Sequence, residues 1–251
     1  MAISNYLIID YGNSRIKACA FDRMQNAMLE NVQVKAGSSA QALLDQMTTL
    51  KDKFKVEKVV MSITAKPEVS QPFVDELKKI LGVDVKVIGK QDFTDIIDFR
   101  NIDKNVVIGS DLLLMAAYGI YVLNSGAIIS LGTVYTAVIF NHSQIVNVLL
   151  IPSIVRGMNQ IPDYTAIDKG LLPQEYKTTR GLNTPDAFSA GANWAIEGLA
   201  DNIVRQYSFL SNSVVVTGGD APKFSHLIRK YKNIPNLVII AICELLKYKC
   251  W

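Results

Sequence analysis

The chain has 251 residues, of which 49% are hydrophobic and 20% charged, close to the averages of soluble globular proteins. This composition excludes a disordered chain, a collagen-like repeat and a long coiled coil. The 26 basic and 23 acidic side chains leave a formal net charge of +3, too weak a bias to indicate nucleic acid or a membrane surface as a partner. The length fits one large domain or two small ones.

Cysteine usage and apolar patterning narrow the class of protein. Cys19, Cys243 and Cys250 form no closely spaced pair, so neither a disulfide framework nor a cysteine-rich zinc site is expected. The strand-like run around Cys19 predicts a buried structural thiol, and Cys250 is expected as a free thiol on the tail. The most apolar stretch, residues 112–129, contains a turn signal at 124–126, which favours a buried helix and strand over a membrane span. We see no signal-peptide pattern and expect a cytoplasmic protein.

The first half of the chain opens with three predicted strands. Residues 6–10 are a short apolar run that ends in Asp10, and residues 15–21 alternate between polar and apolar side chains. A third strand is expected over 28–34, so the opening is a β-meander and not a βαβ unit. Four further elements are expected: a helix over 39–50, a strand over 56–63, a helix over 68–81 and a strand over 83–88.

A connecting helix over residues 110–123 leads into a second half with the same plan. The expected elements are strands over 126–130, 134–140 and 144–151, a helix over 153–162, a long helix over 185–209, a strand over 213–217, a helix over 221–231, a strand over 237–240 and a C-terminal helix. Thr184 is the predicted N-cap of the long helix, with Pro185 at its first position.

The two halves repeat each other where their first strands end. Residues 7–13 read LIIDYGN and residues 127–133 read AIISLGT, with every number 120 higher in the second copy. Because each segment is followed by a meander, the pattern predicts a duplicated α/β domain with a cleft between the copies. We expect an N-terminal domain over 1–108 and a C-terminal domain over 109–251 that includes the connecting helix.

The glycine turns at these strand ends suggest phosphate binding. A glycine allows the backbone to approach a ligand and to take an unusual φ, and exposed N–H groups can hold phosphate oxygens. A carboxylate at the strand end, such as Asp10, can hold Mg²⁺. Further glycine turns at 132–133 and 217–220 strengthen this interpretation, although an ordinary β-hairpin is the alternative for any one turn. The P-loop and dinucleotide-binding motifs are absent from the sequence.

This order of motifs resembles the type III pantothenate kinase family, within the actin, hexokinase and Hsp70 superfamily. Residues 10–17 (DYGNSRIK) are similar to the family's first phosphate motif, Asp-x-Gly-Asn-Thr-x-x-Lys, and residues 132–133 to its second, Asp-x-Gly-Thr. Residues 109–111 (GSD) match the start of its Gly-x-Asp-Arg motif. Residues 183–191 and 217–221 resemble two downstream segments. The resemblance implies a duplicated ribonuclease-H-like, actin-like ATPase fold, α/β in class, with ATP between its two domains.

The resemblance also implies a reaction and a role for each matching residue. The reaction is ATP-dependent phosphorylation of pantothenate, the first step of coenzyme A biosynthesis. The residues assigned to ATP are Asp10, Gly12, Asn13, Ser14, Lys17, Gly132, Thr133, Gly218 and Gly219. Those assigned to the substrate are Gly109, Ser110, Asp111, Leu112 and Thr184.

The two carboxylates among these residues, Asp10 and Asp111, have the chemical roles in this assignment. Asp111 would be the general base that accepts the proton of the substrate hydroxyl, and Asp10 would lie near Mg²⁺. The simpler alternatives are a helix N-terminal carboxylate for Asp111 and a plain N-cap for Thr184. Since the family's active site lies near its dimer interface, the expected partners are pantothenate and either a second copy or a paralogue.

The sequence departs from the family pattern mainly on the substrate side. Leu112 stands where the family has an arginine, which removes a bidentate anchor for a carboxylate. Ser130 replaces the aspartate associated with a monovalent cation, K⁺ or NH₄⁺, and a neutral hydroxyl is a poorer cation ligand. Ile102 aligns near a family tyrosine, and residues 147–153 lack three family glycines.

Three interpretations are compatible with this pattern. The chain is an active but divergent pantothenate kinase, a weakly active or non-catalytic paralogue that pairs with or regulates a competent subunit, or another sugar- or acid-kinase-like phosphotransferase. His142 and His226 have no partner at ligand spacing, so they do not indicate a metal site. Trp194 and Trp251 are expected to be packing residues.

Overall fold

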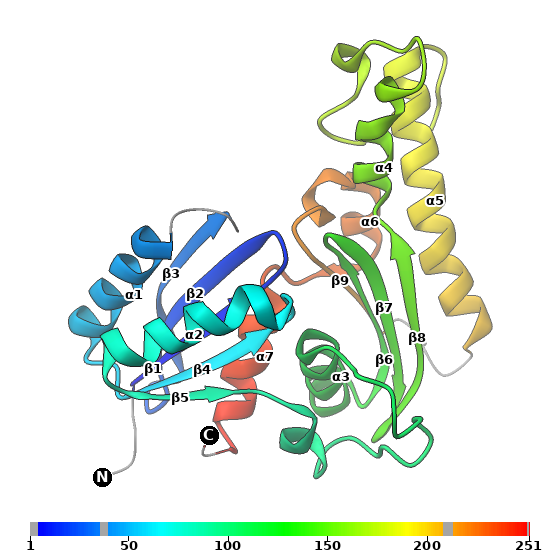
Figure 1. Cartoon of the computed structure of the whole chain (residues 1–251). Coiled ribbons are helices and arrows are strands. Elements are labelled where there is room, and N and C mark those ends of the chain that lie inside the picture. The colour runs from blue at the N-terminus through cyan, green and yellow to red at the C-terminus, as the bar shows by residue number, and fades with distance from the viewer. Residues whose placement is uncertain (1–4, 36–39, 208–212, 250) are drawn as a thin grey trace. The chain divides into compact units, whose positions relative to one another are not determined.

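The computed structural model describes residues 5–35, 40–207, 213–249 and 251 (Figure 1). The chain divides into two compact units. Unit 1 consists of Met1–Asp95, Arg100–Tyr118 and Val238–Trp251, and unit 2 consists of Ile96–Phe99 and Gly119–Leu237. This division differs from the predicted ranges 1–108 and 109–251, because most of the connecting helix and the last 14 residues belong to unit 1.

Unit 1 is built on a five-stranded sheet in the order β3-β2-β1-β4-β5. Its strands are β1 (Asn5–Tyr11), β2 (Arg15–Asp22), β3 (Ala27–Lys35), β4 (Lys58–Ile63) and β5 (Asp84–Val87). The first three form the predicted antiparallel meander, and β4 and β5 continue the sheet parallel to β1. Its helices are α1 (Ala40–Phe54), α2 (Pro67–Leu81), the start of α3 (Ser110–Leu123) and nearly all of α7 (Leu237–Leu246), with a 3₁₀ turn at Lys90–Phe93.

Side-chain alternation gives the sheet of unit 1 two different faces. Leu7, Ile9 and Tyr11 of β1 pack with buried residues of α1 and α2 in one apolar cluster. Since successive side chains of a strand point to opposite faces, Ile8 and Asp10 lie on the other face. The first predicted site residue is therefore outside the apolar cluster and at the carboxyl end of its strand.

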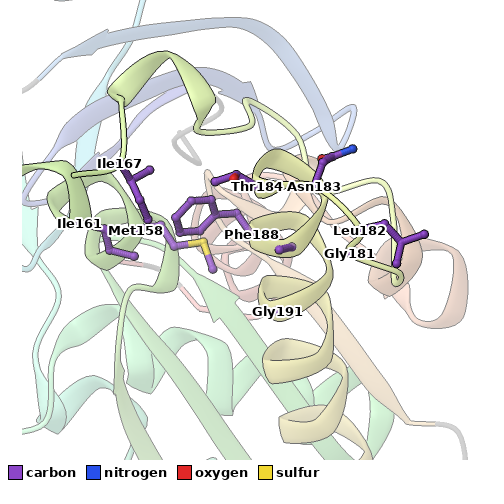
Figure 2. Close-up of a pocket in the computed structure, with 10 residues that line it drawn as sticks. Met158, Ile161, Ile167, Gly181, Leu182, Asn183, Thr184, Phe188 and Gly191 are labelled. Atoms are coloured by element: carbon purple, nitrogen blue, oxygen red, sulfur yellow. The ribbon is translucent and has the colours of Figure 1, made fainter. Parts of the chain in front are cut away.

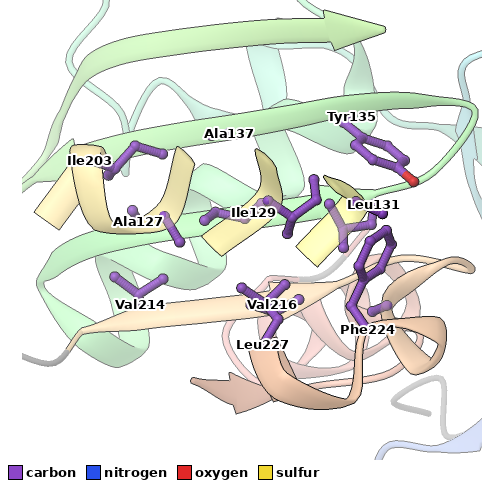
Figure 3. Packing of buried hydrophobic residues seen from close by; sticks show 14 of the residues in the cluster. Ala127, Ile129, Leu131, Tyr135, Ala137, Ile203, Val214, Val216, Phe224 and Leu227 are labelled. Atoms are coloured by element: carbon purple, nitrogen blue, oxygen red, sulfur yellow. The ribbon is translucent and has the colours of Figure 1, made fainter. Parts of the chain in front are cut away.

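Unit 2 repeats this plan with a sheet in the order β10-β9-β6-β7-β8. Its strands are β6 (Ser125–Leu131), β7 (Val134–Asn141), β8 (Gln144–Pro152), β9 (Val214–Thr217) and the short β10 (Lys232–Asn233). Its own helices are α4 (Ile154–Gln160), α5 (Thr184–Gln206) and α6 (Ser225–Lys230), with 3₁₀ turns at Ile161–Asp163, Lys169–Leu171 and Ala221–Lys223. Figure 3 shows the cluster in which Ala127, Ile129 and Leu131 of β6 pack with β7, β9, α5 and α6.

The meander followed by parallel strands in both sheets confirms the predicted duplicated α/β fold. Most predicted elements are present, and their ends shift by a few residues. Residue 39 of the first predicted helix, residues 208–209 of the long helix and Cys250 lie outside the described residues. None of the helices in the described part of the chain combines the length and apolar character needed to cross a bilayer.

Four local predictions are corrected by the structure. The strand expected over 237–240 is wrong, because this apolar run is the start of helix α7, whose residues are largely buried. The helix expected over 221–231 is a 3₁₀ turn followed by α6. Asn183, not Thr184, is the N-cap of α5, since its side chain accepts the N–H of Asp186. Trp251 is buried, as is Cys19, but Trp194 is 71% exposed and is not a core residue.

Candidate active site

The β1–β2 hairpin of unit 1 holds the first predicted phosphate turn. The Gly12 N–H donates to the Arg15 carbonyl at 3.0 Å, which puts Asn13 and Ser14 at the tip. A Cβ on Gly12 would lie 3.0 Å from the same carbonyl oxygen, so the glycine allows a close approach within the hairpin and has no positive φ. Since the Gly12 N–H is used internally, the candidate phosphate donors of this turn are Asn13, Ser14 and Lys17.

Asp10 lies between two polar neighbours in the sheet. The strand register pairs it with Lys17 on β2 and with Ser62 on β4. Burial, opposed by the attraction of Lys17 and supported by the charge of Asp111, raises the pKa of Asp10 to about 6. Asp10 is thus a partly buried carboxylate whose negative charge is incompletely compensated, which is the condition under which a carboxylate favours a nearby cation.

Ser110, the first residue of α3, is fastened to the end of β4. Its hydroxyl accepts the Ile63 N–H at 3.1 Å and donates to the Ile63 carbonyl at 3.0 Å. The Ser62 and Ser110 hydroxyl oxygens are 2.9 Å apart, and both side chains are buried. Ser110 therefore has its polar groups satisfied by β4. Ser62 is not among the residues predicted from the sequence, although a polar residue near the end of an apolar strand was the available signal.

Asp111 follows in the first turn of α3 and is half-buried. Its carboxylate accepts the Leu112 N–H at 2.9 Å. Burial raises the pKa of Asp111, while hydrogen bonds from the backbone N–H groups of Leu112 and Asp111 itself oppose the shift. A Cβ on Gly109 would lie 2.6 Å from Asp111 Oδ1, so the glycine provides the space that this carboxylate occupies. The raised pKa is suited to a group that accepts a proton near neutral pH.

In unit 2 the corresponding strand end is neutral. Ser130 is paired with Thr136 on β7 and with Thr217 on β9, so three hydroxyl side chains lie in a row across the sheet. The next turn contains Gly132 and Thr133, and the Arg156 guanidinium donates to the Thr133 hydroxyl at 3.4 Å. A Cβ on Gly132 would meet only an ordinary contact of 3.6 Å, so this glycine is not required by packing.

The glycine turn after β9 is tightly fitted to β6. Gly218 has a φ of +101°, and a Cβ there would lie 2.4 Å from the Leu131 carbonyl oxygen. The Asp220 N–H donates to that oxygen at 2.8 Å. The Asp220 carboxylate pairs with Lys223 at 3.0 Å and accepts a hydrogen bond from the Tyr135 hydroxyl at 3.3 Å. Gly219, the other predicted ATP residue of this turn, is exposed.

Thr184 lies apart from the other predicted residues of unit 2, in a pocket of about 800 Å³ (Figure 2). The pocket is lined mainly by apolar side chains of α4, α5 and the segment between them: Met158, Ile161, Ile167, Gly181, Leu182, Asn183, Thr184, Ala187, Phe188 and Gly191. Among the described residues, none in this lining is a lysine or an arginine. Thr184 can offer a hydroxyl here, but the pocket contains no charge complementary to a carboxylate.

The geometry therefore forms one compact polar cluster in unit 1 from residues far apart in the sequence: Asp10, Lys17, Ser62, Ser110 and Asp111. Leu112 is next to this cluster and half-buried. In unit 2 the Ser130 row and the two glycine turns lie at one end of β6 and β9, whereas Thr184 is elsewhere. Arg156 beside Thr133 was not foreseen from the sequence.

The donor sets differ in their suitability for metal ions. Asp10 fits a magnesium ion held through water, because its charge is partly buried and the neighbouring Asp111 carboxylate is also anionic. Among the described residues no three His, Cys, Asp or Glu side chains gather into a metal-binding group. The Ser130 row offers only hydroxyl oxygens, so these residues do not fit the monovalent cation that was associated with this position.

The sequence model of a family described as type III pantothenate kinase matches residues 6–206. A search of curated proteins found no match.

Solved structures show the same fold at low identity. A Campylobacter jejuni protein described as a conserved Baf family transcriptional activator has a TM-score of 0.59 and 16% identity, over 96% of this chain and 97% of that one. The ethanolamine utilization protein EutJ of Carboxydothermus hydrogenoformans has a TM-score of 0.55 and 10% identity, over 99% and 91%. A ROK family glucokinase of Streptomyces griseus, solved with glucose and AMPPNP, has a TM-score of 0.52 and 15% identity, over 96% and 98%. These likenesses confirm the actin-like ATPase fold.

Proposed function

The chain belongs to the type III pantothenate kinase family, and from this premise we propose that it phosphorylates pantothenate with ATP to give 4'-phosphopantothenate, the first step of coenzyme A biosynthesis. The coarser class, a kinase of the actin-like ATPase fold, follows from the family and the fold. The observation that carries the proposal is the polar cluster of unit 1, where Asp111 lies close enough to Asp10 for its charge to raise the pKa of that carboxyl.

In the proposed reaction Asp111 is the general base. Its carboxylate accepts the proton of the acceptor hydroxyl, whose oxygen forms a bond to the γ-phosphorus while the bond from that phosphorus to the ADP oxygen breaks. Burial raises the pKa of Asp111, which makes it a better proton acceptor than an exposed aspartate. The Leu112 N–H donates to one of its oxygens and fixes the orientation of the carboxylate.

The candidate nucleotide-binding groups are the turns of both units. In unit 1 these are the donors of Asn13, Ser14 and Lys17, and in unit 2 the turns at Gly132, Thr133, Gly218 and Gly219, with Arg156 as an additional cation. Asp10 is the residue that would hold Mg²⁺, and the ion, when bound, supplies positive charge against the phosphate oxygens. Nothing in the Ser130 row supports a requirement for K⁺ or NH₄⁺.

The alternative is a weakly active or non-catalytic paralogue that pairs with or regulates a competent kinase. It is favoured by Leu112, which cannot bind a carboxylate as the family arginine does. The described lining of the Thr184 pocket, which includes no lysine or arginine, points the same way, since pantothenate is an acid. The paired catalytic-site carboxylates Asp10 and Asp111 favour the active kinase.

We also propose that the chain works as a dimer, with itself or with a paralogue. Helix α4 and the first part of α5 extend together beyond the strands of unit 2 (Figure 1). Trp194 on α5 is 71% exposed, and Leu182, which lies just before the start of this helix, is 79% exposed. Exposed apolar side chains of this size commonly mark protein–protein contacts.

The decisive experiment measures ADP release by the purified chain with ATP and Mg²⁺, with and without pantothenate, in sodium and in potassium or ammonium salts. Pantothenate-dependent ADP release that is equal in all three salts is the expected result. A folded, nucleotide-binding chain without pantothenate-dependent release would contradict the kinase proposal and support the partner-subunit alternative, whose test is restored release on adding a co-purified paralogue.

A further inference from the structure

The start of α3 is joined to the end of β4 through the Ser110 hydroxyl. The Ser110 hydroxyl makes two hydrogen bonds with the backbone of Ile63, at 3.1 Å from the N–H and 3.0 Å to the carbonyl. It also contacts the Ser62 hydroxyl at 2.9 Å. Ser110 is 7% exposed and Ser62 is completely buried, so water does not compete for these bonds.

A count of protons determines the direction of the bond between the two serines. A hydroxyl has one proton and accepts through two lone pairs. The Ser110 proton goes to the Ile63 carbonyl, and one lone pair takes the Ile63 N–H. The second lone pair of Ser110 is therefore the acceptor for the Ser62 proton. Ser110 is saturated by β4, so its hydroxyl is not available to bind a substrate, in contrast to the role that the family resemblance implied.

The same two serines connect the two carboxylates of the polar cluster. Ser62 is the register partner of Asp10 across the β1–β4 pair, and Ser110 is adjacent to Asp111 in the chain. We propose that Ser62 and Ser110 are a positioning pair that fixes the first turn of α3 on the sheet and so holds the Asp111 carboxylate beside Asp10. The catalytic consequence of this pair rests on the proposed kinase function, whereas its effect on α3 does not.

The Asp111 carboxylate lies in a small space, so its position depends on where the first turn of α3 is held. The Oδ1 atom already lies where a Cβ on residue 109 would be only 2.6 Å away. The helix begins at this point, with the Leu113 N–H bonded to the Gly109 carbonyl at 3.1 Å. Release of Ser110 from β4 would free the first turn to move, and a displacement of about 1 Å of a catalytic group can reduce turnover by about 100-fold.

The test compares Ser110→Ala, Ser62→Ala and Ser110→Thr with Ser70→Ala as a matched control. Ser70 is a buried serine of unit 1 whose hydroxyl donates at 3.2 Å to the carbonyl of Lys66, the N-cap residue of α2. With pantothenate and ATP, we expect kcat to fall on the order of 100-fold in Ser110→Ala, with KM for ATP unchanged. Ser110→Thr, which keeps the hydroxyl, should recover most of kcat, and Ser70→Ala should leave kcat unchanged.

Amide hydrogen exchange gives a readout that needs no activity. In Ser110→Ala the Ile63 and Leu113 amides should exchange on the order of tenfold faster than in the wild type, while amides of α2 stay unchanged. Ser62→Ala removes a single hydrogen bond and should show a smaller change at the same amides, which keeps the test available if Ser110→Ala does not fold.

Wild-type exchange at Ile63 and Leu113 in Ser62→Ala and Ser110→Ala would overturn the pairing. A kcat equal to the wild type in a folded Ser110→Ala would overturn its catalytic consequence. If the wild-type chain itself releases no ADP with pantothenate, the proposed function fails, and the exchange rates still decide whether the two serines hold α3.

Discussion

Gly218 lies with its Cα directly against the backbone of Leu131, so that a Cβ on residue 218 would be 2.4 Å from the Leu131 carbonyl oxygen. The φ of Gly218 is +101°, in the region that favours glycine. The contact joins the turn after β9 to the end of β6, which are neighbouring parallel strands. A backbone-to-backbone contact of this kind has no flexible side chain that can move away.

Gly218→Ala should therefore destabilise unit 2 by about 2–4 kcal/mol, since it adds both an unfavourable φ and a clash with fixed backbone. The measurement is the free energy of unfolding in urea. Gly198→Ala is the control, because Gly198 lies within α5 and a Cβ there meets nothing within 4 Å. It should be neutral or more stable by up to about 1 kcal/mol. Equal losses in both variants would contradict the explanation.

The raised pKa of Asp10 makes stability depend on pH in a definite direction. Between the ordinary aspartate pKa of 3.8 and the raised pKa of about 6, the folded chain holds a proton on Asp10 that the unfolded chain has lost. Stability from this group therefore falls as pH rises through that window. The cost above pH 6 is on the order of 2–3 kcal/mol, from about 1.4 kcal/mol per pKa unit.

Asp10→Asn removes this titration. Without Mg²⁺, its Tm should exceed that of the wild type at pH 7–8, and the difference should vanish near pH 4. Differential scanning fluorimetry from pH 4 to pH 8 gives both curves. Asp84→Asn is the control, since its exposed carboxylate pairs with Lys58 and has a lowered pKa. A Tm difference that is constant across the range would contradict the assignment to Asp10.

Asp111→Asn tests the general base. The amide keeps the size of the side chain and cannot accept the hydroxyl proton, so kcat should fall by about 10²–10⁴-fold. Nucleotide affinity, measured by calorimetry, should stay within about twofold of the wild type. The substitution removes no contact that holds the nucleotide and only takes away the repulsion between the Asp111 carboxylate and the phosphates. Unchanged turnover would exclude Asp111 from proton transfer.

Leu112→Arg tests whether the missing anchor is the main defect on the substrate side. A guanidinium can form two hydrogen bonds with a carboxylate. If pantothenate is the acceptor, its KM should fall by about tenfold or more, with kcat little changed. Leu112→Gln, which is polar but uncharged, serves as the control. A KM that does not move would indicate that the acceptor's carboxylate is not near residue 112.

Trp194→Ser tests the proposed contact surface on α5. The loss of an exposed tryptophan from the centre of an interface commonly costs 2 kcal/mol or more, so the dimer should dissociate at about 30-fold higher concentration. Sedimentation of a dilution series measures this. Tyr248→Ser, which removes another exposed aromatic side chain at 62% exposure, should have no effect. A wild-type chain that sediments only as a monomer would rule out the homodimer.

The fold could be predicted because its signals are local and repeated. The alternation in residues 15–21 and the matching segments 7–13 and 127–133 specify strands and turns without reference to the rest of the chain. The strand expected over 237–240 failed because apolar β-branched residues fit a buried strand and a buried helix equally well, and the surrounding packing decides between them.

The candidate site was predictable only in part. Asp10, Lys17 and Asp111 were found because they lie in motifs. Ser62 was not, because its role depends on the register between β1 and β4 and on the docking of α3, which are long-range contacts. Gly12 was assigned to ATP from its motif alone, and the motif does not reveal that its N–H is bonded to the Arg15 carbonyl within the hairpin.

Unit 1 is assembled from three separate pieces of the chain, whereas unit 2 is almost continuous. A ribosome synthesises a chain from its N-terminus, so residues 119–237 are complete before residues 238–251 emerge. The apolar helix α7, with Ile239, Ile242 and Leu245 buried, is therefore the last part of unit 1 to be made. Although the sheet of unit 1 is translated before unit 2, unit 1 should finish folding after unit 2.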